Sequence, residues 1–254
     1  TDKTLSFGLL NDIEQWTLLD PVYKAYTKNL CGYAERGEKE WKRLLGSFFA
    51  EGVNIAVVKN NTNEIEGYAV YRLGSPEIPV TEFVYTTRRA QRGLLNYFYN
   101  HRSQGESIRW NEGLHDTGYR FVPDGKTGHI TMPYMMARIV DVETALTTVP
   151  VNPEAVMMPI TLTIKITDSL CTWNDGVFEL TLGESITPKV KRVSDVAKED
   201  IDLTIDVGGL AVLLMGAVSA KDLVFEGKLD GESHWIDYLD MVYPKQNTYI
   251  NEWW

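Results

Sequence analysis

The strictest pattern in the sequence is the alternation of apolar and polar residues in ITLTIKITD, residues 160–168. Isoleucine or leucine occupies every second position from 160 to 166, and threonine or lysine lies between them. Because successive side chains of a β-strand point to opposite faces, this stretch predicts a strand with one buried and one solvent-exposed face. GVFELTL and ITPKVKRV predict further strands, and the apolar residues of 201–243 predict another strand and the helices that cover the buried face.

The first half of the chain follows a different pattern, in which runs with helical spacing alternate with runs typical of strands. The sequence NNTNE, residues 60–64, lies between two strand-like runs and predicts the turn of a hairpin. In the first helix, Pro21 is expected in the first turn, where a missing N–H costs little. We expect helices over 21–30 and 38–49, a third helix carrying Leu94, Leu95 and Phe98, and strands over 54–59, 65–73, 80–85 and 106–113. Helices interleaved with strands predict an α+β (α/β) layer architecture.

A stretch rich in Gly, Thr and Pro, residues 124–133, separates the two patterns. After it the sequence predicts a short strand, YMMARIV, and a helix through VETAL that Asp141 caps. We therefore expect two domains, 1–138 and 139–254, with a functional tail at the end of the second.

Composition disfavours several classes of partner. The 254 residues carry a formal net charge of −10, which opposes binding to nucleic acids and to anionic membrane surfaces. No apolar run approaches the ~20 residues of a membrane span, and no signal peptide is visible. Cys31 and Cys171 fall in different halves, so we expect free thiols and a cytoplasmic location. Because the sequence begins at Thr1 without a methionine, we expect a processed chain or a piece of a longer protein.

Residues 84–98, VYTTRRAQRGLLNYF, resemble the strand, loop and helix with which GNAT acyltransferases hold coenzyme A. Loops of that family read Q/R-x-x-G-x-G/A. Here Ala90 stands at the Gln or Arg position, Leu95 stands at the second small position, and Gly93 alone is retained. Glycines let successive backbone N–H groups turn toward a diphosphate, and this loop lacks them. We therefore expect that this chain holds no cofactor here.

The side chains of the same loop leave two interpretations open. Thr86 or Thr87 can cap the helix, which makes the segment an ordinary strand-to-helix turn. Arg88 and Arg89 can still attract an anion, although cations in a first turn oppose the helix dipole. Elsewhere G-x-S-x-G is absent, and no metal site is expected because the histidines show no ligand spacing, namely His101, His115, His129 and His234.

Four segments together resemble the enhanced-intracellular-survival (Eis) type of GNAT N-acetyltransferase. They are RIVDVETAL (138–146), CTWNDGVFEL (171–180), IDVGGLAVLLMG (205–216) and MVYPKQNTYINEWW (241–254), while GYAVYRL and TEFVY resemble the middle domain of that family. Members have an N-terminal GNAT domain that holds acetyl-CoA, a second GNAT-like domain without cofactor, and a sterol-carrier-like domain. The resemblance covers the second and third parts. It implies a GNAT-like mixed sheet with helices, followed by a sterol-carrier-like sheet covered by helices.

The resemblance also implies a reaction, the transfer of acetyl from acetyl-CoA to an amine, often a polycation or an aminoglycoside. Acetyl-CoA would belong to the missing N-terminal GNAT domain, so this chain alone is expected to be inactive. The other partners implied are a small-molecule amine and further copies of the chain in a homo-oligomer, with no nucleic acid and no membrane.

Site residues follow from the same resemblance. It assigns the C-terminal main-chain carboxylate, here that of Trp254, to the catalytic step, where it takes or relays a proton from the attacking ammonium. Glu252 and the acidic chain would attract a cationic substrate. Trp41 and Met135 fall in regions that resemble substrate-facing segments, and both are also typical core residues.

Two non-catalytic functions stay open. The sterol-carrier-like sheet can hold a lipid or another apolar ligand between its buried face and the GGLAVLLMG helix. Alternatively, the two domains serve mainly as an oligomerisation module.

Overall fold

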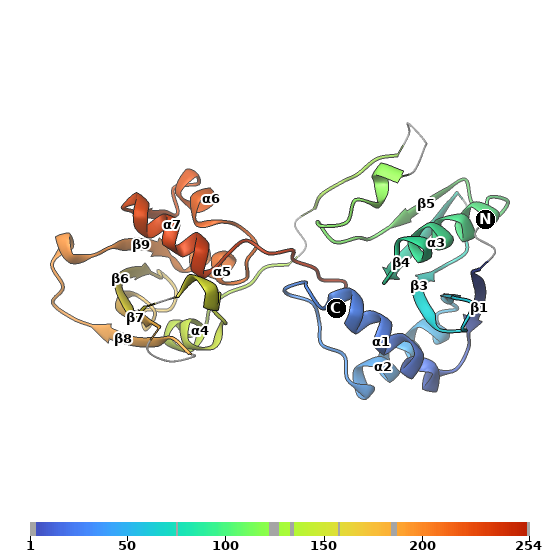
Figure 1. Ribbon diagram of the computed structural model, residues 1–254, viewed down its shortest axis with the longest axis horizontal. Helices are drawn as coiled ribbons and strands as arrows, with labels where there is room; N and C mark the ends of the chain where they lie inside the picture. Colours follow the sequence, from blue (N-terminus) through green and yellow to red (C-terminus); the bar gives the residue numbers. More distant parts are fainter. Residues whose placement is uncertain are drawn as a thin grey trace. The chain divides into compact units, whose positions relative to one another are not determined.

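The computed structural model describes residues 4–74, 76–121, 127–132, 135–156, 158–183 and 187–252. The chain forms two compact units, of which the first comprises Thr1–Met132 and Thr248–Trp254 and the second comprises Pro133–Asn247 (Figure 1). The end of the chain therefore belongs to the first unit, whereas the sequence assigned it to the second domain. The contacts of residues 248–252 described below are the physical reason.

The first unit contains a five-stranded sheet in the order β1-β2-β3-β4-β5. Its strands are β1 (Ser6–Leu10), β2 (Asn54–Lys59), β3 (Ile65–Tyr71), β4 (Glu77–Tyr85) and β5 (Ser107–Trp110). The strands from β1 to β4 pair antiparallel, and β5 pairs parallel with β4. The predicted hairpin joins β2 and β3, and Asn63 in its turn has a φ of 68°, which asparagine tolerates.

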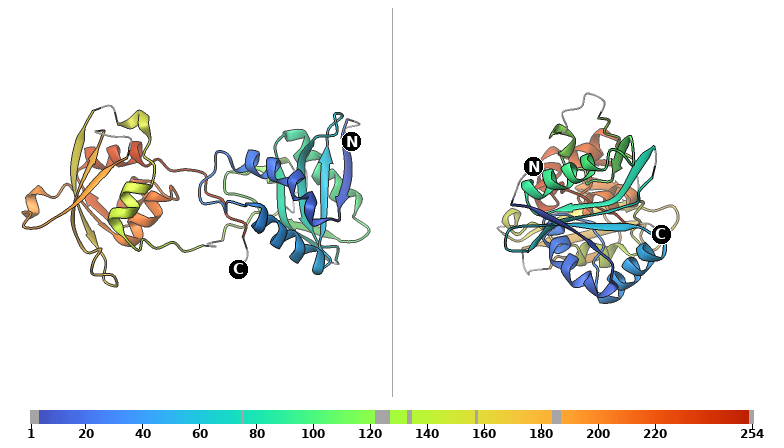
Figure 2. Two further views of the ribbon diagram at one scale, coloured as in Figure 1. Left: turned by 90° about the horizontal axis from the view of Figure 1, so that it is seen from below. Right: turned by 90° about the vertical axis from the view of Figure 1, so that its right-hand side faces the viewer.

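Helices cover both faces of this sheet (Figure 2). On one face lie α1 (Trp16–Thr27) and α2 (Glu38–Ala50), and on the other lies α3 (Arg88–Asn100). In β2, Ile55 and Val57 pack toward α1 and α2, while Ala56 and Val58 pack toward α3. Such continuous burial of a strand is the pattern expected for a sheet covered on both sides.

The first helix begins earlier than the sequence predicted. A 3-10 turn, η1 (Ile13–Gln15), leads into α1, and Asp12 caps that turn by accepting the backbone N–H of Glu14 at 2.9 Å. Pro21 consequently lies inside α1 and not in its first turn. The cap at Asp12 and the buried Leu19 fix the helix start, so the local preference of proline does not decide it. Short 3-10 turns also occur at η2 (Gly118–Phe121), η3 (Pro153–Ala155) and η4 (Lys198–Asp200).

The second unit contains a five-stranded sheet in the order β10-β9-β6-β7-β8, with β6 and β9 parallel. Its elements are α4 (Val142–Thr148), β6 (Ile160–Thr167), β7 (Gly176–Leu182), β8 (Lys189–Val193), β9 (Leu203–Asp206), α5 (Val207–Leu214), α6 (Ala220–Phe225), β10 (Leu229–Gly231) and α7 (Ser233–Val242). The predicted alternation is confirmed, since Leu162, Ile164 and Ile166 of β6 are buried. The helices gather on this one face of the sheet (Figure 2). The predicted α+β class is thus confirmed in both units.

The strand predicted over YMMARIV is wrong for residues 135–140, which form no strand. Side chains occupy the polar groups that a neighbouring strand would use. The Trp173 indole and the Asn174 amide both donate to the Val140 carbonyl, at 2.8 and 3.2 Å. The helix cap at Asp141 is confirmed, because its carboxylate accepts the Thr144 N–H at 2.7 Å.

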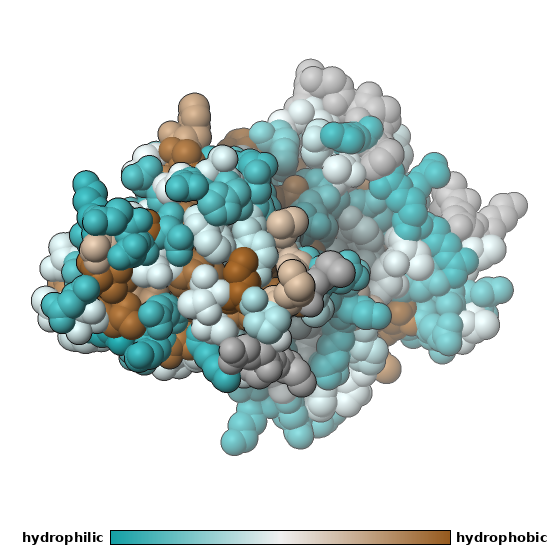
Figure 3. Space-filling view, turned by 60° about the vertical axis from the view of Figure 1, so that its left-hand side comes forward, coloured by the Kyte–Doolittle hydropathy of each residue, from teal (hydrophilic) through white to brown (hydrophobic). Residues whose placement is uncertain are grey.

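Among the described residues, no helix combines the length and apolar character needed to cross a bilayer. The second unit nevertheless exposes several large apolar side chains, and Figure 3 shows brown surface in separate places on the face that comes forward. Phe225, at the end of α6, is 95% exposed. Others in this unit are Met158, Leu170, Trp173 and Met241.

Candidate functional site

A carboxylate of the chain itself, that of Glu66, occupies the start of α3. Thr87 caps the helix, since its hydroxyl accepts the Ala90 N–H at 3.2 Å and donates to Glu66 Oε2 at 2.8 Å. Arg89 donates through Nε to the same oxygen at 2.7 Å and through Nη2 to the other oxygen. These hydrogen bonds from Arg89 hold the pKa of the Glu66 carboxyl below its usual range, although burial acts in the opposite direction. The arginine therefore already has an internal anion.

A second buried carboxylate lies beside the same helix start. The Gln91 amide donates to the Tyr85 hydroxyl at 2.9 Å and to Asp116 Oδ1 at 3.3 Å, and Tyr85 donates to the other oxygen of Asp116. Arg88 donates to Gln91 Oε1 at 2.7 Å, and the Gly118 N–H donates to Asp116 at 2.8 Å. A carboxylate buried in this way repels a phosphate and occupies donors that a phosphate would need.

Gly93, the one glycine retained from the loop pattern, is explained by packing. A Cβ atom at this position would lie 2.9 Å from Leu5 Cδ1 and 3.5 Å from Val58 Cγ2. The glycine thus lets α3 lie close to the sheet, and it does not shape a turn around a ligand. With the carboxylates of Glu66 and Asp116 beside it, the start of α3 does not fit the diphosphate of a coenzyme.

The C-terminal tail, residues 248–252, is fixed to the first unit. The Tyr249 N–H donates to the Cys31 carbonyl at 2.9 Å, and the Tyr249 ring is buried among the residues between α1, α2 and the sheet. The Asn251 amide donates to the Thr81 carbonyl in β4 at 2.7 Å. These contacts hold the tail along the unit up to its last described residue.

Arg36, in the loop between α1 and α2, is the centre of this contact. Its Nη1 and Nη2 donate to the two carboxylate oxygens of Glu82 at 3.2 and 2.5 Å, and its Nε donates to Glu252 Oε1 at 2.7 Å. The guanidinium carbon lies 4.2 Å from the ring centre of Tyr23 and 4.7 Å from that of Trp41. Only 6% of Arg36 is exposed, so the cluster is a buried ion network framed by aromatic rings. We call these five residues the tail anchor.

The electrostatics of the tail anchor favour full ionisation of its arginine. Burial by itself lowers the pKa of Arg36, but the Glu82 carboxylate outweighs it, so the pKa of Arg36 lies above its ordinary value. The Tyr68 hydroxyl donates to Glu82 Oε2 at 2.8 Å, and burial raises the pKa of Tyr68 well above its ordinary value. Tyr68 is therefore a neutral donor that helps to satisfy the carboxylate.

The structure brings two of the four sequence-predicted site residues together. Trp41 is 1% exposed and its indole donates to Asp20 Oδ1 at 3.0 Å, while Glu252 is 8% exposed, and both contact Arg36. Met135 lies in the second unit, 44% exposed, and makes no part of this cluster. Trp254 lies outside the described residues.

Sequence reasoning missed Arg36, Glu82 and Asn251, which hold the tail. Nothing in their local sequence distinguishes them from surface residues. The partners of Arg36 are 46 and 216 positions away along the chain. One weak signal exists, since a glutamate in the buried strand VTEFVY is an unusual polar residue that needs a partner.

A further polar group in the first unit lies between α1 and the loop after β5. The Tyr26 hydroxyl and His115 Nδ1 are buried without a hydrogen-bond partner, and their rings lie 5.9 Å apart. Burial lowers the pKa of His115 and raises that of Glu112. Within the described ranges, no group of histidine, cysteine, aspartate or glutamate side chains has the arrangement of a metal site.

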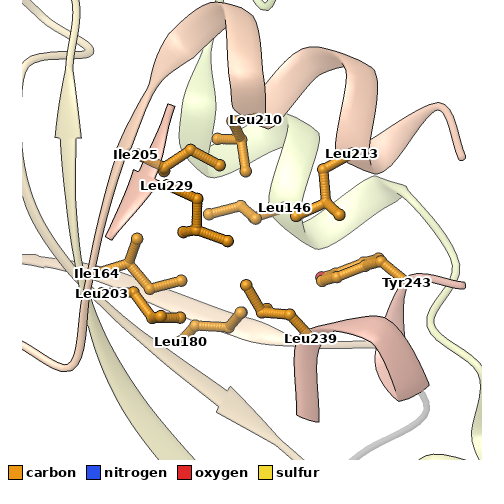
Figure 4. Close-up of a pocket in the computed structure, with 10 residues that line it drawn as sticks. All are labelled: Leu146, Ile164, Leu180, Leu203, Ile205, Leu210, Leu213, Leu229, Leu239 and Tyr243. Carbon is orange, nitrogen blue, oxygen red and sulfur yellow. The ribbon is translucent and has the colours of Figure 1, made fainter. Parts of the chain in front are cut away.

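The second unit encloses a small apolar cavity between its sheet and helices (Figure 4). It offers about 10 Å³ to the centre of a water molecule, which is roughly the space of one water. The side chains that line it are Leu146, Ile164, Leu180, Leu203, Ile205, Leu210, Leu213, Leu229, Leu239 and Tyr243. The Tyr243 hydroxyl points toward the cavity and is buried without a hydrogen-bond partner. The apolar face of the sheet is thus filled almost completely by the chain's own side chains.

Two domain families match the chain in sequence. Residues 32–139 match the acetyltransferase (GNAT) domain, and residues 142–251 match the sterol carrier protein domain. No curated protein sequence matches the chain.

Solved structures share the fold over nearly the whole chain. A probable N-acyltransferase from Enterococcus faecalis has a TM-score of 0.81 at 23% identity, over 98% of this chain and 62% of that one. A GCN5-related N-acetyltransferase from Anabaena variabilis has a TM-score of 0.75 at 17% identity, over 99% of this chain and 63% of that one. Eis1 from Mycobacterium abscessus has a TM-score of 0.64 at 18% identity, over 100% of this chain and 63% of that one.

The chain therefore spans less than two thirds of the length of these relatives. The predicted resemblance is confirmed at the level of domains and fold: a match to the acetyltransferase (GNAT) domain is followed by a match to the sterol carrier protein domain, and the chain shares its fold with Eis1.

Proposed function

We propose that the chain completes the active site of an N-acetyltransferase by delivering its C-terminal carboxylate to a cofactor-bearing domain outside the sequence described here. The observation that supports this proposal is the docking of residues 248–252 on the first unit. Burying charges costs free energy. The buried ion network that holds residues 248–252 therefore supports a function that requires the tail in a fixed place.

The carboxylate of Trp254 has the chemistry for one step. An amine is protonated at neutral pH and becomes a nucleophile only after losing a proton, and a carboxylate within hydrogen-bond reach accepts it. An α-carboxyl group has an ordinary pKa of about 3.5, so it is ionised and ready to act as the acceptor. The net charge of −10 favours the approach of a cationic amine, such as an aminoglycoside.

Acetyl-CoA, held by the other domain, would supply the acetyl group. The start of α3 in this chain does not fit that cofactor, because Glu66 and Asp116 occupy it and Gly93 is used for packing. Calorimetry of the 254-residue chain with acetyl-CoA is expected to show no binding. Micromolar binding would contradict this part of the proposal.

The decisive experiment moves the carboxylate without removing side chains. In the longer enzyme, one glycine added after Trp254 displaces the terminal carboxylate by about 3.5 Å. We expect kcat to fall by about 10²-fold or more, as for loss of a general base, while the melting temperature stays the same. Deletion of Trp254 should give a similar loss. Unchanged turnover in both variants would remove the carboxylate from the mechanism.

The lipid-carrier alternative meets a physical obstacle in the second unit, because its cavity has room for about one water. A lipid would require the core around Leu146 and Leu239 to open. Native mass spectrometry of the purified chain tests this directly, and a co-purified lipid would favour the carrier function.

Self-association is the second candidate function. Exposed apolar side chains such as Phe225 favour contacts with other chains. Sedimentation velocity of the chain and of Phe225→Ser, over a range of concentrations, measures whether this surface contributes to a homo-oligomer.

A further inference from the structure

The contacts within the tail anchor fix the orientation of the Arg36 guanidinium as well as its position. Glu82 binds the guanidinium of Arg36 through both terminal nitrogens, and the rings of Tyr23 and Trp41 lie against the guanidinium. A guanidinium is planar and rigid, so holding it at these points also fixes its remaining edge. That edge carries Nε and Nη2, which both lie 2.7 Å from Glu252 Oε1.

Along the sequence, Glu252 is the charged side chain nearest to the C-terminal carboxylate. Two residues follow it, and a chain of that length reaches no more than on the order of 10 Å. Holding the Glu252 side chain in place therefore limits, through the covalent chain, how far the terminal carboxylate can move. The neighbouring contact of Asn251 with the Thr81 carbonyl is a neutral hydrogen bond, which is weaker than a charge-assisted one.

We propose that Arg36 is a positioning residue for the acetyl-transfer reaction: presented by Glu82, it holds Glu252 and thereby aims the terminal carboxylate at the amine. This inference rests on the function proposed above. It also gives Glu252 a role in anchoring the tail, since its carboxylate is buried and paired with a cation, and so presents little negative charge to a cationic substrate.

The test uses Glu252→Gln, which keeps the shape of the side chain and leaves Arg36 paired with Glu82. In the 254-residue chain, hydrogen exchange at the Tyr249 amide reports tail docking, because this amide donates to the Cys31 carbonyl. We expect exchange to accelerate about tenfold or more. In the longer enzyme, with acetyl-CoA and kanamycin as the amine probe, we expect kcat to fall about tenfold or more with KM for acetyl-CoA unchanged.

Two further variants complete the test. Arg36→Lys keeps the charge but loses the planar guanidinium that binds two carboxylates at once. It should therefore also lower kcat and leave the KM for acetyl-CoA unchanged. Glu226→Gln is the matched control, because Glu226 forms an exposed ion pair with Lys228 in the second unit, and neither exchange at Tyr249 nor turnover should change.

The outcomes separate this inference from the proposed function. Unchanged exchange at Tyr249 in Glu252→Gln would overturn the anchoring role, whatever the activity. Faster exchange with unchanged kcat, in an enzyme that Trp254 deletion inactivates, would overturn the positioning role while the proposed function stands. If Trp254 deletion leaves turnover intact, the proposed function fails and the positioning role fails with it.

Discussion

Each unit pairs a buried carboxylate with an arginine, and the two networks are built in different ways: Arg36 is itself buried, whereas the side chain of Arg138 is 41% exposed. In the first unit, the hydrogen bonds of Arg36 join segments 46 and 216 positions apart. In the second, Asp168 accepts the N–H groups of Leu170 and Cys171, two and three positions away, and then binds Arg138. The first network ties the end of the chain to a distant loop, whereas the second mainly shapes the turn between β6 and β7 and adds one contact to Arg138, 30 positions before Asp168. A buried charge can therefore serve a long-range connection or a local one, and substitutions distinguish the two.

The largest effect is expected for Arg36→Met. It leaves Glu82 and Glu252 buried without their cation, and breaking a buried ion network by removing one partner costs about 3–5 kcal/mol. Urea unfolding of the chain measures the loss. The control is Arg72→Met, which removes an exposed pair with Glu51 and should cost less than about 1 kcal/mol. Equal losses of unfolding free energy in the two variants would mean that the tail anchor contributes little to the stability of the chain.

The next effect concerns Asp168 and depends on pH. The backbone N–H of Cys171, together with Asn174 and Arg138, holds the pKa of Asp168 well below its usual range, although burial acts in the opposite direction. A depressed pKa stabilises the folded state at pH values above the ordinary aspartate value of about 4, and that contribution is lost as pH falls below it.

Asp168→Asn should therefore be less stable than the parent at pH 7, and the difference should shrink at pH 3. Chemical denaturation at the two pH values checks this expectation. Asp230→Asn, at an exposed aspartate in β10, is the control and should show no such convergence. A difference that persists undiminished at pH 3 would show that the carboxylate charge is not what stabilises the turn.

Tyr68 and Tyr243 allow a buried hydroxyl that donates a hydrogen bond to be compared with a buried hydroxyl that has no partner. The Tyr68 hydroxyl donates to Glu82, so Tyr68→Phe should destabilise the first unit by about 1.5–3 kcal/mol, the usual range for a hydrogen bond to a charged group. Thermal unfolding monitored by near-ultraviolet circular dichroism would measure it. Unchanged stability of Tyr68→Phe would imply that Arg36 alone satisfies the hydrogen-bonding capacity of the Glu82 carboxylate.

Tyr243→Phe is expected to have the smallest effect and the opposite sign. Its hydroxyl is buried at the apolar cavity without a partner, so removing it should stabilise the second unit by about 1 kcal/mol. The same unfolding measurement applies. Destabilisation would indicate that the cavity holds a bound water or a ligand that uses this hydroxyl.

Local patterns account for the part of the fold that the sequence predicted. The alternation in β6, the cap at Asp141 and the turn around Asn63 each depend on residues within a few positions of one another. The same holds for the start of α3, where the absence of a glycine-rich loop and the cap by a threonine were both visible. Strand β1 was missed because its residues SFGLL lack a clear period.

The site could be predicted only in part. The tail and Glu252 followed from a resemblance, but Arg36 and Asn251 did not, because their partners are distant in the sequence and only the folded chain brings them together. The interpretation of Trp41 as a core residue is confirmed by its burial, whereas the contact of its ring with Arg36 could not be predicted from the sequence. Gly93 resembled a remnant of a binding loop, whereas its reason is the distance to Leu5 and Val58.

The order of the units along the chain has a consequence for biosynthesis. Residues 248–252 leave the ribosome after the whole second unit, yet they supply the last partner of Arg36 in the first. During translation the first unit therefore carries an incomplete ion network, and it reaches its final stability only when synthesis has passed Glu252. A nascent chain that stops before Glu252 lacks this ion pair, so its first unit is held together by fewer charged contacts.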